Sequence, residues 1–120
     1  MYKKIKCDKD LVKDIILSGY QTAKIVLSAF KKTKMYDPDS ELSSIRVCTF
    51  LFNKGLNVIE IRWDHNTDGT EILVGSNGEL HKCFAIPESP SESSDKISDI
   101  IYSHFTTAGF STLEARELGH

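Results

Sequence analysis

The stretch that most constrains this chain is residues 44–86, where four short segments of strand-forming residues follow one another. Each segment is rich in β-branched and aromatic residues, and turn-forming residues separate it from the next. The separators are Asn53-Lys54-Gly55, Asn66-Thr67-Asp68-Gly69 and Asn77-Gly78. Asn-Gly is a strong hairpin signal, because both central positions of a type I′ turn need positive φ. The block therefore predicts a four-stranded antiparallel meander.

A long amphipathic helix is predicted before this block, over residues 9–34. Its apolar residues recur at intervals of three and four, and Asp8 precedes it as an N-cap. Gly19 lies on the apolar stripe, which favours a close approach to a packing surface. Charged and apolar residues alternate weakly over residues 1–7, so this segment suits either an edge strand or a lead-in to this helix.

A second amphipathic helix is predicted after the block, over residues 94–108, and Gly109 is expected to end it. Ser111 and Glu114 have the spacing of a capping box, which predicts a short final helix over 111–119. The segments 35–43 and 87–94 contain proline, serine and acidic residues and are predicted to be loops.

These elements predict a single α+β domain over residues 1–120. We expect two layers, with the long N-terminal helix and the C-terminal helix packed on the same face of the meander. The length is that of one ordinary domain, with enough apolar residues to form a core without metal or disulfide staples.

Composition favours a cytoplasmic protein. The chain has no apolar run long enough to cross a membrane and no secretory signal. Its three cysteines are an odd number without a CxxC spacing, which indicates free thiols in a reducing compartment. Residues 1–60 carry eleven Lys/Arg against seven Asp/Glu, whereas residues 61–120 carry four against ten. The sequence pI of about 6.1 argues against nucleic acid as a partner.

One loop resembles a metal-binding motif. Asp64, Asn66 and Asp68 match the opening of a calcium loop, in which carboxylates and amides at alternate positions face one cation. The rest of the motif is missing. The twelfth position of the loop, where a calcium loop has a bidentate Glu, is Gly75, and the flanking segments are strand-like where the motif has helices. A structural turn is the preferred interpretation, and we expect neither a metal nor another cofactor.

Chemistry at a Cys/His cluster is the enzymatic hypothesis. Pairing of the strands could bring Cys48, Cys83 and His81 together, although no local spacing resembles a zinc or nucleophile motif. Trp63, beside Arg62, is interpreted as a core or rim residue that could instead stack on a ligand. The sequence favours a non-enzymatic protein over an enzyme.

The strands carry more apolar side chains than one covered face requires. If two helices cover one face, Phe50, Phe52 and Val58 are expected on the other, with Leu73 or Phe84 beside them. A monomer rarely leaves such a patch in water. We therefore expect a protein partner or a homodimer on this face, as in an adaptor, inhibitor, immunity-type or chaperone-type protein.

The alternative hypothesis is a small-ligand or nucleotide-binding protein, with its pocket between sheet and helix or at a dimer interface. The residues expected to bind a ligand or partner are Phe50, Phe52, Val58, Arg62, Trp63 and His81.

Overall fold

The computed structural model describes residues 2–33, 47–77 and 79–117. Of Tyr2, residues 47–49, His81, Lys82 and Glu117 it describes the backbone only. The predicted loop 35–43 lies outside the described residues. The elements in chain order are β1 (Tyr2–Lys6), α1 (Lys9–Lys31), β2 (Val47–Lys54), β3 (Asn57–Asp64), β4 (Gly69–Ser76), β5 (Glu79–Ile86), α2 (Ser94–Thr107) and β6 (Thr112–Glu117).

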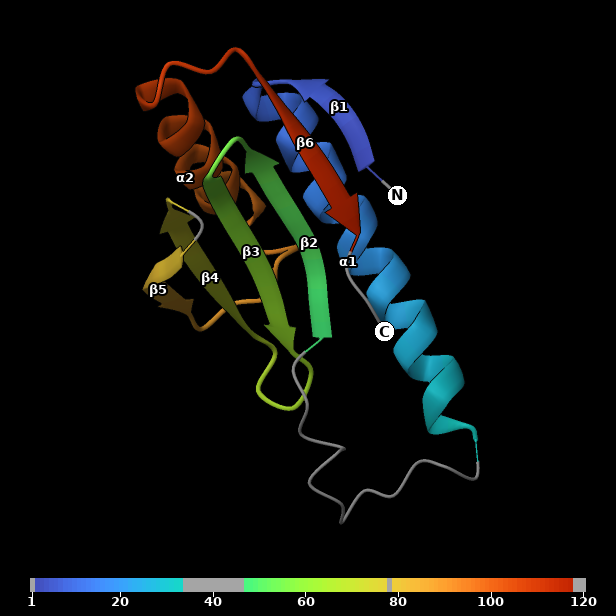
Figure 1. Ribbon diagram of the computed structural model, residues 1–120. Coiled ribbons are helices and arrows are strands. Elements are labelled where there is room, and N and C mark those ends of the chain that lie inside the picture. Colours follow the sequence, from blue (N-terminus) through green and yellow to red (C-terminus); the bar gives the residue numbers. More distant parts are fainter. Residues whose placement is uncertain (1, 34–46, 78, 118–120) are drawn as a thin grey trace.

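The described strands form one antiparallel sheet with the order β1-β6-β2-β3-β4-β5. Figure 1 shows α1 and α2 on the same side of this sheet. One core joins the two helices to the strands, and its fully buried side chains include Ile16 from α1, Phe105 from α2 and Ile61 from β3. The predicted two-layer α+β fold is confirmed, with the meander extended by two further strands.

The start of α1 is determined by a side-chain N-cap. An Asp8 carboxylate oxygen accepts hydrogen bonds from the backbone N–H groups of Asp10, at 2.9 Å, and Leu11, at 3.1 Å. These bonds satisfy donors that have no partner within the first turn, so the predicted N-cap is confirmed.

Two ion pairs join the exposed sides of α1 and α2. They are Lys9–Asp99 at 3.1 Å and Lys13–Asp95 at 2.7 Å.

The last element is a strand, so the prediction of a final helix over 111–119 is wrong. In β6, Leu113 and Ala115 are buried, while Glu114 and Arg116 point to the opposite face. This period of two matches a strand, and the capping-box spacing was misleading. The strand lies between β1 and β2, where pairing on both sides supplies more hydrogen bonds than one helical turn could.

Two β-bulges determine which side chains each face carries. The pairing shifts by one residue between Cys48 and Phe50 in β2, and again within β5, where Val74 pairs with Lys82 and Gly75 with Leu80. An extra residue at a bulge moves every following side chain to the other face. A regular two-residue hairpin at Asn77-Gly78 would pair Val74 with His81 and Ile72 with Cys83, whereas the bulge pairs them with Lys82 and Phe84.

The bulge in β2 turns its two phenylalanines toward the helices. Phe52 is fully buried, and Phe50 packs on the core with its ring 5.6 Å from that of Phe52. Phe50 also occupies the space where a Cβ at Gly19 would lie. This contact confirms the predicted close approach of α1. The prediction that Phe50 and Phe52 lie on the uncovered face is wrong.

Candidate functional site

The sheet face opposite the helices, here called the open face, is covered by neither α1 nor α2 (Figure 1). Cross-strand pairing assigns its residues. The apolar ones are Leu51, Val58, Leu73, Leu80, Cys83 and Ala85. The charged ones are Lys4, Lys6, Glu60, Arg62, Asp64, Glu71, Glu114 and Arg116. The face is thus a mixture of apolar and charged side chains.

The apolar residues of the open face are concentrated in β4 and β5. Leu80 is 42% exposed, Cys83 and Ala85 are exposed, and Leu73 is half-buried beside them. Val58, a predicted binding residue, lies on this face half-buried, as expected. An apolar strip next to the outer edge of the sheet is therefore formed by Val58, Leu73, Leu80, Cys83 and Ala85.

Charged residues flank this strip. Arg62, a second predicted binding residue, also lies on the open face, where its guanidinium donates hydrogen bonds at 2.9 and 3.2 Å to one carboxylate oxygen of Glu60. The two residues are neighbours on the same face of β3, separated by one residue. This pair keeps both charged groups at the surface beside Leu51, which is only 9% exposed.

Trp63 lies on the opposite side of β3, under α1. Only 5% of the residue is exposed, and its ring meets that of Tyr20 edge-on with centroids 5.0 Å apart. Its indole N–H donates a 2.8 Å hydrogen bond to a carboxylate oxygen of Asp68. Burial raises the pKa of the Tyr20 hydroxyl, and the negative charge of Asp68 raises it further. Of the two sequence interpretations, this arrangement supports core packing for Trp63.

Replacing Asp68 with alanine should lower the free energy of unfolding by about 1–2 kcal/mol, because a half-buried indole N–H loses its acceptor. Asp68 also has a positive φ of 59°, which asparagine tolerates better than alanine. Asp68→Asn should therefore retain most of the stability. Urea unfolding followed by the fluorescence of Trp63, the one tryptophan of the chain, measures both variants. Equal losses in the two variants would contradict this role of the acceptor oxygen.

The candidate cation loop has the geometry of a turn. An Asp64 carboxylate oxygen accepts the backbone N–H of Asn66 at 3.0 Å, and the Thr67 hydroxyl oxygen accepts that of Gly69 at 3.3 Å. The Asp68 carboxylate is held by Trp63 instead. Within the described parts of the chain, no group of three or more His, Cys, Asp or Glu side chains could hold a metal ion.

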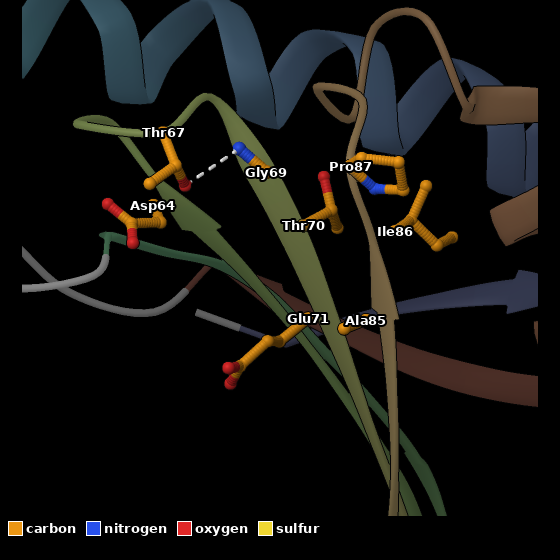
Figure 2. Close-up of a pocket in the computed structure, with 8 residues that line it drawn as sticks. All are labelled: Asp64, Thr67, Gly69, Thr70, Glu71, Ala85, Ile86 and Pro87. Atoms are coloured by element: carbon orange, nitrogen blue, oxygen red, sulfur yellow. Dashed lines mark hydrogen bonds between the residues drawn. The ribbon is translucent and has the colours of Figure 1, made fainter.

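A shallow hollow of about 300 Å³ lies at one end of the sheet (Figure 2). Asp64 and Thr67 border it on one side and Ile86 and Pro87 on the other, while the Glu71 carboxylate points away from Pro87. The described lining residues include two carboxylates and no lysine or arginine. Such a lining does not suit the phosphates of a nucleotide.

The topology separates the predicted Cys/His cluster. Cys48 is in β2 and Cys83 in β5, with β3 and β4 between them, so their backbones are about 14 Å apart at ordinary strand spacing. His81 lies at the bulge of β5, and its side chain is outside the described atoms. Cys83 is an exposed free thiol on the open face.

Comparison of the chain with family models, curated proteins and solved structures gives no significant match. Neither described helix combines the length and the apolar character needed to cross a membrane.

Sequence reasoning missed Leu51, Leu80 and Glu71 as residues of the candidate surface. The assignment of Leu51 depends on the bulge in β2, which neither period nor composition predicts. Two signals were available for the others: β4 pairs with β3 without a shift, so alternation places Glu71, and Leu80 follows the Asn-Gly turn directly and so belongs to the edge strand.

Proposed function

We propose that this chain is a small cytoplasmic, non-enzymatic binding protein of the adaptor, inhibitor, immunity or chaperone type. It binds a protein partner or a second copy through the open face. The central contact is the apolar strip formed by Val58, Leu73, Leu80, Cys83 and Ala85, with Arg62 beside it.

The observation that supports this proposal is the position of the strip on the sheet. It lies on the side without helices and reaches β5, the edge strand, whose outer backbone groups have no neighbouring strand among the described residues. The opposite edge, β1, is protected differently, because Lys3, Lys4 and Lys6 make up three of its five residues. An apolar strip that reaches an edge strand is typical of a binding surface.

Replacing Leu73 with glutamate should abolish partner binding without unfolding the chain, because the new charge would be desolvated in the interface. The test is affinity capture from a native-host extract, comparing the original chain with Leu73→Glu. A partner that the original chain retains and Leu73→Glu loses supports the proposal.

Leu56→Glu is the matched control, since Leu56 is 61% exposed in the β2–β3 turn, at one end of the sheet. It should capture the same partner as the original chain. Equal capture by all three proteins would contradict a role for the open face.

A further inference from the structure

The C-terminal half of α1 extends past the body of the protein. Figure 1 shows its last turns running beyond the ends of β2 and β3. The last buried residue of the helix is Ala23, and the helix continues from there to Lys31. Leu27 packs against the cluster of Tyr20, Ala23 and Trp63, so the opposite side of these turns faces solvent.

A hollow of about 620 Å³, here called the helix hollow, lies on this solvent-facing side. Ile25, which is 69% exposed, and Ala29 provide its apolar surface, and Lys24 and Lys32 border it. The other described lining residues are Gln21 and Ser28. Residues four apart are neighbours on a helix, so Ile25 and Ala29 form one apolar surface between the two lysines.

The lysines at this end of α1 differ from those at its start. The first lysines of the helix form ion pairs with carboxylates of α2, whereas Lys24, Lys31 and Lys32 form none with the described residues. The Lys24 Nζ atom lies 5.2 Å from the centre of the Tyr20 ring. Residues 21–33 contain no Asp or Glu. The projecting end therefore has three positive charges that no described carboxylate compensates.

The spacing of the charges indicates which partner fits. Lys24 and Lys32 are eight residues apart, which is about 12 Å along the helix axis. Two carboxylates eight residues apart on a partner helix have the same spacing, and an apolar residue midway between them would lie over Ile25. A membrane surface fits less well, because a helix that lies on lipid needs a broad apolar face, whereas Gln21 and Ser28 share this side.

We propose that the outer side of α1 between Gln21 and Lys32 binds an acidic amphipathic helix of a partner protein. Carboxylates of that helix contact Lys24 and Lys32, and an apolar side chain between them packs in the helix hollow. This surface belongs to α1, on the other side of the sheet from the open face, so it is a second binding surface beyond the proposed function.

The probe for this surface is a fluorescein-labelled synthetic helix of alanine and glutamine, with Glu, Leu and Glu placed four residues apart. Fluorescence anisotropy at low salt should show saturable binding with a Kd on the order of 100 μM, since the contact is small and its ion pairs are exposed. Lys24→Glu with Lys32→Glu should weaken binding at least tenfold, and Ile25→Ser several-fold. Added salt should weaken the binding of the original chain.

Two variants serve as controls. Lys6→Glu with Lys96→Glu makes the same change of charge at exposed positions on β1 and α2, and Leu73→Glu changes the open face. Both should bind the probe like the original chain. If the double charge reversal on α1 fails to fold by circular dichroism, Lys24→Gln with Lys32→Gln replaces it and should weaken binding several-fold.

Equal binding by the original chain and the variant reversed at Lys24 and Lys32 would overturn the inference. So would equal binding of a probe with Gln in place of both Glu residues, or no binding up to about 1 mM probe. Sedimentation with phosphatidylglycerol–phosphatidylcholine vesicles, without binding of the probe, would assign the surface to a membrane instead and also overturn it. Loss of probe binding in Leu73→Glu would place the acidic helix on the open face, against the inference.

Discussion

Replacing Phe52 with alanine should lower the free energy of unfolding by about 3–5 kcal/mol, because the removed ring leaves a cavity in the core. Phe52 is fully buried and packs against Phe50. A loss of this size is a large part of the total stability of a small domain, so we expect the variant to be largely unfolded at body temperature. Urea unfolding followed by circular dichroism measures the change.

The control for this prediction is Leu80→Ala. Leu80 is 42% exposed on the open face, so its loss should change stability by less than about 0.5 kcal/mol. Phe52→Ala should leave little folded protein to bind a partner, whereas Leu80→Ala should fold and bind weakly. A stable Phe52→Ala variant with lost binding would instead return Phe52 to the binding surface.

Replacing Gly75 with alanine should lower the free energy of unfolding by about 2–3 kcal/mol, because the new Cβ has no space. It would overlap the backbone carbonyl oxygen of Glu79 and lie 2.8 Å from the carbonyl carbon. The obstacle is backbone, so rotation of a side chain cannot relieve it. The β4–β5 hairpin would have to open at its bulge, next to the apolar strip.

Gly69→Ala is the matched control, since it makes the same substitution in the same strand. Its Cβ would be 3.3 Å from the carbonyl oxygen of Ile86, a tight contact that a small shift relieves. We expect a loss below about 1 kcal/mol from thermal or urea unfolding. Similar losses at Gly69 and Gly75 would contradict the close backbone crossing at the bulge.

Local signals in the sequence predicted most of the fold. The turn residues placed β2 to β5, the apolar periods placed α1 and α2, and Asp8 placed the start of the first helix. Each of these features depends on residues close together in the chain. β6 was not predicted, because its strand conformation depends on pairing with β1, more than a hundred residues away.

The candidate site was predicted only in part. Val58 and Arg62 were placed correctly, because clean alternation in β3 assigns its faces without knowledge of the neighbouring strands. Phe50 and Phe52 were placed wrongly, because one extra residue in β2 reverses every face after it. A bulge is one extra residue in one strand, and no residue type in β2 marks its position, so sequence alone could not reveal it.

Cys83 provides the most direct test of the claim that the open face binds a partner, because it is an exposed free thiol within the apolar strip. In a folded variant with Cys7→Ser and Cys48→Ser, the rate of alkylation of Cys83 reports the accessibility of this face. We predict that the rate falls several-fold as the protein is concentrated through the micromolar range or mixed with native-host extract. An unchanged rate under both conditions would contradict binding at the open face.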